Sequence, residues 1–214
     1  MIIPKLHYIS QGESPKELLE NIQKACTSGA ELVQLRIENA SEKKVLKIAK
    51  EAIKITSHFQ TRLIIFEYFK VAKEIKADGI HIEKIDSFTS IARKQLYPWQ
   101  IIGATANTLQ DCEKLIAKEV DYITLSPFKA VEMQSKHSSA LGLNGFLAIT
   151  EALKTETPIL GFGEITTNDV ADILKTGISG IAVSNAITQN FDSIKTFHQL
   201  LNASATQEQR HTFK

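Results

Sequence analysis

Short apolar runs alternate with amphipathic helical patterns along the chain, and residues 61–86 show this most clearly. Residues 63–66 form an apolar run suited to a strand that is buried on both faces. Apolar positions then recur at helical spacing over residues 69–77, with charged positions between them. Residues 79–82 form a second apolar run after the helix ends. The pattern predicts a strand, helix, strand unit with parallel strands.

The same alternation continues on both sides of this unit. The sequence predicts strands over residues 6–10, 32–37, 63–66, 79–82, 101–106, 122–127, 158–163 and 180–184. It predicts helices over residues 15–28, 41–60, 69–77, 87–96, 108–119, 144–154, 167–176 and 191–201, with an irregular stretch over 128–141. Eight short strand–helix pairs favour an α/β fold, a single-domain (β/α)8 TIM barrel, over an open doubly wound sheet. We expect the barrel over residues 1–203 and a polar C-terminal tail over 204–214.

A TIM barrel places its ligand groups just after the strands, at the C-terminal face. The polar and glycine residues at the predicted strand ends are Gln34, Arg36, Glu38, Glu67, Glu83, Lys84, Asp86, Thr105, Asn107, Ser126, Lys129, Gly161, Gly163, Glu164, Ser184 and Asn185. Each one alone is more typical of a solvated loop residue than of a ligand. Together they predict a single pocket, because the strand ends converge there.

Three kinds of chemistry are candidates at this mouth. The Arg36 guanidinium suits a carboxylate or phosphate ligand, or a structural pair with Glu38 or Glu67. Glu67 and Asp86 end neighbouring strands and are a candidate pair of oxygen ligands for Mg²⁺. The last two strands end in glycines and in Ser184, at the corner where many TIM barrels hold a phosphate on backbone N–H groups.

Composition narrows the class of partner. With 25 Lys and Arg against 24 Asp and Glu, the chain exerts no global attraction on nucleic acid. Cys26 and Cys112 lack metal-ligand spacing and are expected to be reduced thiols. No apolar run reaches the roughly 20 residues of a membrane span, and no signal-peptide pattern opens the chain. We therefore expect a cytoplasmic protein. His81, on a predicted strand, is expected to be a packed, hydrogen-bonded barrel residue rather than an acid or base.

Several segments carry a resemblance to a known family. They are LVQLR at 32–36, KADGIHI at 76–82, Asp86, IGATANT at 102–108, VDYITLSPF at 120–128, PILGFGEIT at 158–166 and GISGIAVSNAI at 177–187. In order and spacing the chain resembles the thiamine phosphate synthase (thiamine-phosphate pyrophosphorylase) family and its sibling branch of TenI thiazole tautomerases. The resemblance implies a TIM barrel, usually a homodimer. It also implies Mg²⁺-supported joining of hydroxymethylpyrimidine diphosphate to thiazole phosphate, with release of pyrophosphate.

The resemblance assigns roles residue by residue. It implies catalytic roles for Arg36 and Thr105 and a magnesium site at Glu67 and Asp86. The substrate-binding positions that it implies are Gln34, Arg36, Asn107, Lys129, Gly161, Gly163 and Ser184.

The chain also departs from the family pattern at the mouth. Glu38 stands where the family has Lys, Phe66-Glu67 where it has Asn-Asp, and Glu164 where it has the second Gly of a pair. The substituted positions are Glu38, Phe66, Val131, Met133, Gln134, Glu164 and Asn185, and Asn107 occupies the position of the tautomerase branch's catalytic His. Two hypotheses follow. The chain is either a divergent thiamine phosphate synthase or a repurposed family barrel that binds a metal or a cationic small molecule at an acidic mouth.

Overall fold

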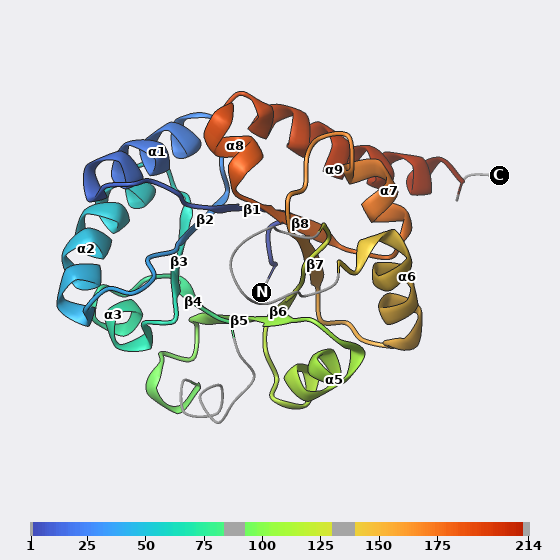
Figure 1. The fold of residues 1–214 in the computed structure, drawn as a ribbon, viewed down its shortest axis with the longest axis horizontal. Helices are drawn as coiled ribbons and strands as arrows, with labels where there is room; N and C mark the ends of the chain where they lie inside the picture. Colours follow the sequence, from blue (N-terminus) through green and yellow to red (C-terminus); the bar gives the residue numbers. More distant parts are fainter. Residues whose placement is uncertain (1, 84–92, 130–139, 212–214) are drawn as a thin grey trace.

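The chain folds into a closed barrel of eight parallel strands in sequential order, β1 to β8 (Figure 1). The computed structural model describes residues 2–83, 93–129 and 140–211. The strands are β1 (Leu6–Ile9), β2 (Leu32–Leu35), β3 (Arg62–Phe66), β4 (Gly79–Ile82), β5 (Ile101–Ala106), β6 (Tyr122–Leu125), β7 (Ile159–Phe162) and β8 (Gly180–Val183). Strand β1 pairs with β8 to close the ring. The predicted TIM barrel is confirmed.

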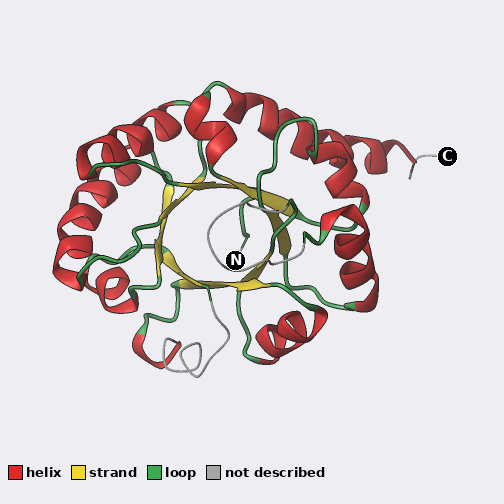
Figure 2. Cartoon of the chain, in the orientation of Figure 1, coloured by secondary structure: helices red, strands yellow, loops and turns green. Residues whose placement is uncertain are grey.

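The described helices surround the barrel as an outer layer (Figure 2). They are α1 (Pro15–Thr27), α2 (Glu42–His58), α3 (Phe69–Glu74), α5 (Leu109–Ala117), α6 (Gly142–Ala152), α7 (Val170–Lys175), α8 (Asn185–Gln189) and α9 (Ser193–His211). Most of the helix predicted over 87–96 lies outside the described residues. The sequence prediction missed the short helix α8, and it ended the last helix ten residues before its observed end at His211.

Local sequence explains where several helices begin. The side chains of Ser14, Ser41 and Thr108 each accept a hydrogen bond from the backbone N–H three residues later, which caps α1, α2 and α5. Pro15 occupies the first turn of α1, where its missing N–H leaves no hydrogen bond unmade. These caps fix the point at which the chain leaves the barrel mouth after each preceding strand.

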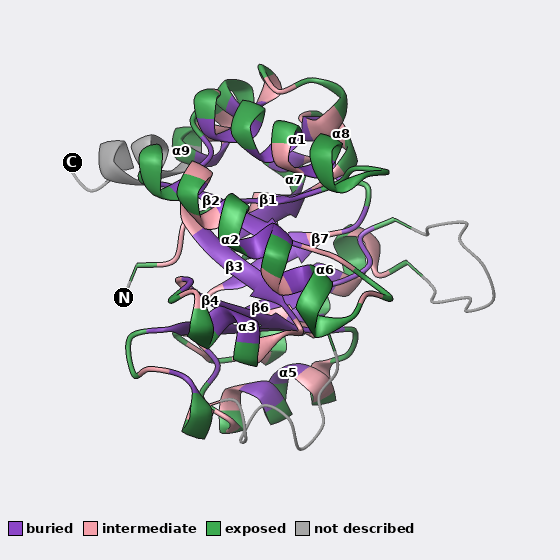
Figure 3. Cartoon of the chain, turned by 90° about the vertical axis from the view of Figure 1, so that its left-hand side faces the viewer, coloured by how far each residue is buried: buried purple, intermediate pink, exposed green. Residues whose placement is uncertain are grey.

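The barrel interior and the layer between strands and helices form two apolar clusters. Figure 3 shows the strands as buried and the outer faces of the helices as exposed. The interior cluster, at the base of the barrel, consists of Leu32, Ile64, Ile101, Tyr122 and Leu160. Because strand side chains alternate between faces, the residues two and four positions further along each strand rise through the interior toward the mouth. No helix among the described residues is long and apolar enough to cross a membrane.

Candidate active site

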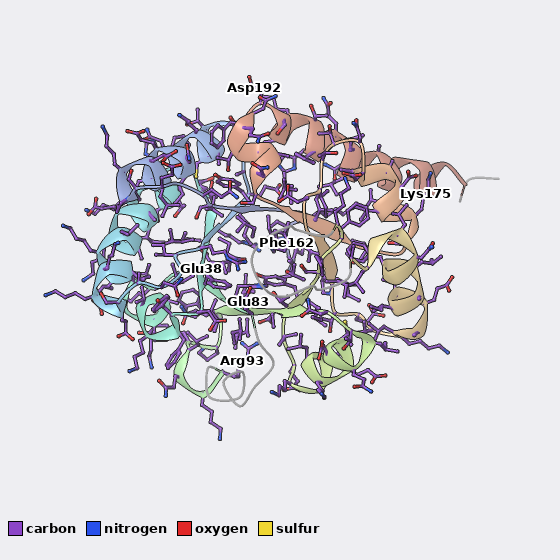
Figure 4. The ribbon with its side chains drawn as sticks, in the orientation of Figure 1. Glu38, Glu83, Arg93, Phe162, Lys175 and Asp192 are labelled. Carbon is purple, nitrogen blue, oxygen red and sulfur yellow. The ribbon has the colours of Figure 1, made fainter. Side chains whose placement is uncertain are left out.

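A cleft of about 530 Å³ opens at the C-terminal ends of the strands. The strand ends and the loops after β1, β2, β6, β7 and β8 form its walls. Figure 4 places Phe162 near the middle of the barrel, with Glu38 and Glu83 toward its left and lower walls, whereas Lys175 on α7 and Asp192 just before α9 lie in the outer layer. The residues that line the cleft are Ile9, Ser10, Gln11, Gly12, Arg36, Glu38, Ser126, Pro127, Phe162, Gly163, Glu164, Ile165, Thr166, Ala182, Val183, Ser184, Asn185, Ala186 and Gln189.

The guanidinium of Arg36 is held between two carboxylates on one wall of the cleft. Its Nε donates to Oε1 of Glu38 at 2.6 Å, and a terminal nitrogen donates to Oε1 of Glu83 at 2.9 Å. The guanidinium carbon lies 4.4 Å from the centre of the Phe66 ring, close enough for a cation–π contact. The backbone N–H of Arg36 donates to Oγ of Ser10 at 3.2 Å. The predicted pairing with Glu38 is confirmed, and the second partner is Glu83 rather than Glu67.

Glu67 follows β3 at a backbone φ of 64°, a left-handed conformation that is uncommon for a residue with a side chain. Its backbone N–H donates to the carbonyl of His81, and its Oε1 accepts the backbone N–H of Glu83 at 2.6 Å. Glu67 therefore ties the end of β3 to the end of β4. The carboxylate is half-buried at the barrel mouth, where the sequence predicted a metal ligand.

The predicted metal site is only partly within the described residues, because Asp86 lies outside them. Among the residues that are described, no group of three or more His, Cys, Asp or Glu side chains is arranged to hold a metal. Mg²⁺ commonly takes one or two carboxylates and fills its other positions with water and substrate phosphates. The hard oxygen donor of Glu67 fits that kind of site.

A buried chain of hydrogen bonds runs beneath the mouth. His81 on β4 lies 2.9 Å from the Tyr122 hydroxyl through Nδ1 and 2.9 Å from Thr105 Oγ1 through Nε2. Burial lowers the pKa of His81 to about 3, and the electrostatic effects of His7 and Arg36 act in the same direction. His81 is therefore neutral, and its prediction as a hydrogen-bonded barrel residue is confirmed.

The opposite wall of the cleft is built from the ends of β7 and β8. Gly163 has φ 121°, and a Cβ there would lie 2.6 Å from the backbone nitrogen of Phe128, so only glycine fits. The backbone N–H of Lys129 donates to the Gly163 carbonyl at 3.2 Å, which joins the loop after β6 to this wall. Oγ of Ser184 donates to the Ile9 carbonyl at 2.7 Å. Glu164 is exposed and is one of the residues that line the cleft.

Lys129 is the second described cation of the predicted site, and it is also paired. Its Nζ donates to Oδ2 of Asp169 at 2.7 Å, and the same oxygen accepts the N–H and the hydroxyl of Thr166, both at 2.8 Å. Burial alone raises the pKa of Asp169, but the hydrogen bonds from Lys129 and Thr166 outweigh that effect and lower the pKa. Asn107 is fixed to the rim by a bond from its Nδ2 to the Ser126 carbonyl at 2.6 Å.

The structure brings most of the described candidate residues to one end of the barrel. Gly161 differs, because a Cβ there would point at Phe146 and Ile165, away from the cleft and into the helix layer. Gln34 is buried in the barrel below Arg36. The predicted positions Lys84, Asp86, Val131, Met133 and Gln134 lie outside the described residues.

The sequence prediction did not single out two sets of residues around the cleft. Ser10, Gln11 and Gly12 line it after β1, and Thr166 and Asp169 fix Lys129 beside it. The first set carries the same signal as the other candidates, since polar residues directly follow an apolar strand. The second carries none, because Asp169 falls within the helix predicted over 167–176 and Thr166 directly before it.

These features define a TIM-barrel protein whose ligand cleft lies at the C-terminal ends of its strands, the face that carries the active site in characterised TIM-barrel enzymes. The chain belongs to the thiamine monophosphate synthase family, whose model matches residues 6–187. It is 37% identical over 199 residues to thiamine-phosphate synthase of Flavobacterium psychrophilum, covering 92% of this chain and 97% of that protein. It is 36% identical over 201 residues to thiamine-phosphate synthase of Flavobacterium johnsoniae, covering 92% and 94%.

A solved structure shows the same likeness. Thiamine phosphate pyrophosphorylase of Pyrococcus furiosus superposes with a TM-score of 0.80 at 25% identity. The match covers 93% of this chain and 96% of that one. The family resemblance predicted from the sequence segments is confirmed.

Proposed function

We propose that the chain is a thiamine phosphate synthase, which joins hydroxymethylpyrimidine diphosphate to thiazole phosphate and releases pyrophosphate. The observation that carries the proposal is the guanidinium of Arg36, which lines the cleft and stacks on Phe66. Its other partners are side chains about half exposed, so an incoming diphosphate can replace them. As the family resemblance implies, we infer a cytoplasmic homodimer.

The two walls of the cleft suggest where each substrate binds. We assign the pyrimidine diphosphate to the wall of Arg36, above the buried Gln34, since a guanidinium binds phosphate oxygens through two parallel hydrogen bonds. We assign the thiazole phosphate to the wall of Gly163 and Ser184, which both line the cleft. Lys129, near the second wall, supplies a positive charge once it leaves Asp169.

The chemistry requires a carbon–oxygen bond of the pyrimidine substrate to break as the thiazole nitrogen forms a bond to the same carbon. The departing diphosphate takes the electron pair of the broken bond. Arg36 and the hydroxyl of Thr105 stabilise the charge that develops on its oxygens. Glu67 and Asp86 would hold Mg²⁺, which neutralises charge on the diphosphate when it is bound. Asn107, anchored to Ser126, shapes the rim beside Thr105.

The alternative, a repurposed barrel that binds a cation at an acidic mouth, is not favoured. Relatives that share more than a third of their residues with this chain over nearly its whole length are thiamine-phosphate synthases. The repurposed barrel is supported by the substituted family positions and by the carboxylates that neutralise both Arg36 and Lys129.

Turnover and binding together test the proposal. Pyrophosphate release is measured with both phosphorylated substrates and Mg²⁺, and pyrophosphate binding is measured by calorimetric titration in the presence of Mg²⁺. Release that requires both substrates supports the synthase. Absent pyrophosphate binding that Glu38→Lys, Gln134→Lys and Glu164→Gly together restore would instead support the repurposed barrel.

A further inference from the structure

Tyr122, His81 and Thr105 form one hydrogen-bonded chain inside the barrel. Tyr122 is fully buried at the base, His81 is 3% exposed, and Thr105 lies at the end of β5 near the mouth. Both hydrogen bonds of the chain measure 2.9 Å. Three neighbouring strands, β4, β5 and β6, supply the three side chains, and the proposed reaction assigns a role only to Thr105.

The direction of each hydrogen bond follows from the chemistry of the groups. A neutral imidazole has one N–H donor and one nitrogen acceptor. Burial raises the pKa of Tyr122 far above its usual value, so the phenol keeps its proton. Among the described residues, that hydroxyl has one hydrogen-bond partner, Nδ1 of His81. Because a buried O–H that donates to nothing is costly, Nδ1 accepts, and the N–H lies on Nε2.

This tautomer determines what Thr105 does. The Nε2–H of His81 donates to Oγ1 of Thr105, so the threonine oxygen is an acceptor in that bond. The threonine's own proton must then point elsewhere, and Thr105 stands at the mouth end of its strand. With the opposite tautomer the threonine would donate to His81, and its proton would be turned inward.

We call the hydrogen-bonded set Tyr122, His81 and Thr105 the relay. Two packing features hold it in place. A Cβ on Gly103 would overlap the Tyr122 ring, so the glycine provides the space that lets the ring reach His81. The Phe66 ring stacks at 15° to the plane of His81, with 6.3 Å between ring centres, on the side toward Arg36. The orientation of His81 is therefore fixed by contacts on several sides.

We propose that Tyr122 and His81 are positioning residues. Tyr122 fixes the tautomer of His81, and His81 thereby aims the Thr105 hydroxyl proton at the departing diphosphate. Tyr122 acts through His81, and His81 acts through Thr105. The proposal rests on the synthase function and deepens it. It assigns to two barrel-interior side chains the task of keeping one hydroxyl as a donor toward the substrate.

The test compares Tyr122→Phe with the wild-type chain. The variant keeps the ring and loses the hydroxyl, so we expect kcat to fall about 10-fold with little change in the KM of either substrate. Thr105→Val should lower kcat by about 100-fold and Thr105→Ser should retain most of it, because only the hydroxyl matters. Tyr8→Phe is the matched control, since it removes a buried barrel-strand hydroxyl that bonds Thr188 instead.

The tautomer is read directly by ¹⁵N NMR of the histidine side chains in the wild-type chain, with His81 assigned by His81→Asn. We expect the proton on Nε2, and a mixed tautomer in Tyr122→Phe. A proton on Nδ1 in the wild type would overturn the relay even if Tyr122→Phe failed to fold. If the wild type turns over and folded Tyr122→Phe has the same kcat, the relay is overturned and the synthase function stands. A wild-type chain without turnover would overturn the synthase and the relay with it.

Discussion

Removing the Glu38 carboxylate should strengthen diphosphate binding. Arg36 donates from Nε to Glu38 and from a terminal nitrogen to Glu83, so two of its five N–H groups are already engaged. A diphosphate that binds Arg36 must displace these carboxylates or accept their repulsion. Glu38→Gln keeps the shape of the side chain and a hydrogen-bond acceptor, but it removes one negative charge from the wall of the cleft.

The magnitude follows from the exposure of the three side chains. Arg36 is 25% exposed, whereas Glu38 and Glu83 are 54% and 45% exposed. Two unit charges 4 Å apart interact by about 4 kcal/mol at an effective dielectric of 20, which sets the upper limit. Water around the glutamates brings the pair nearer to the roughly 1 kcal/mol of exposed ion pairs. We therefore expect the pyrophosphate Kd to fall about 5-fold, since 1.4 kcal/mol is a tenfold change.

The assay is calorimetric titration of pyrophosphate with Mg²⁺ into Glu38→Gln, at low and at high salt. Glu51→Gln is the matched control, because it removes the same charge from an exposed ion pair with Lys54 on α2, outside the cleft. The gain from Glu38→Gln should shrink at high salt, since salt screens exposed charges. Equal or weaker binding than in Glu51→Gln would refute the idea that Glu38 restrains Arg36.

Three further predictions follow from the described contacts. Asp169→Asn should release Lys129 and tighten pyrophosphate binding about 2-fold, which titration against the wild type measures. Gly103→Ala should lower the free energy of unfolding by about 1–3 kcal/mol, because its Cβ enters a packed aromatic ring; an unchanged urea midpoint would contradict this. Burial lowers the pKa of His7 and of His81 to about 3, below the value near 6.5 of an unfolded chain. Their contribution to stability is therefore complete above pH 6.5 and lost as pH falls toward 3, at about 1.4 kcal/mol per unit for each histidine. Urea unfolding at pH 7 and pH 5 measures the loss, and His7→Asn should remove about half of it.

The barrel could be predicted because its signal repeats. Each strand–helix pair carries its own apolar period and several carry a cap, so an error in one unit leaves the count intact. The face to which a single strand side chain points is harder to predict, because a shift of one residue along the strand moves it to the opposite face. Phe162 lines the cleft, so its neighbour Gly161 must face the helices, and the alternation rule could have shown this from the sequence.

Other features of the site depend on distances that no local pattern contains. Glu83 is 47 residues from Arg36, and they meet because β3 lies between β2 and β4 in the closed sheet. The sequence offered Glu38, two residues along the chain, and Glu67, at the end of the next predicted strand. Tyr122 was predicted only as part of a strand. Its role becomes visible once the pairing of β4, β5 and β6 places its hydroxyl on His81.

Glu38 has two opposing effects on Arg36, and their balance decides the sign of the principal prediction. Its negative charge competes with the diphosphate, but its hydrogen bond also restrains a side chain that would otherwise lose about 2 kcal/mol of rotamer entropy on binding. That restraint is duplicated, because the guanidinium also lies 4.4 Å from the Phe66 ring and donates to Glu83. The repulsion from the two carboxylates is additive, since each one repels a phosphate separately. Losing Glu38 therefore removes a full unit of repulsion but only part of the restraint, and the balance favours tighter binding.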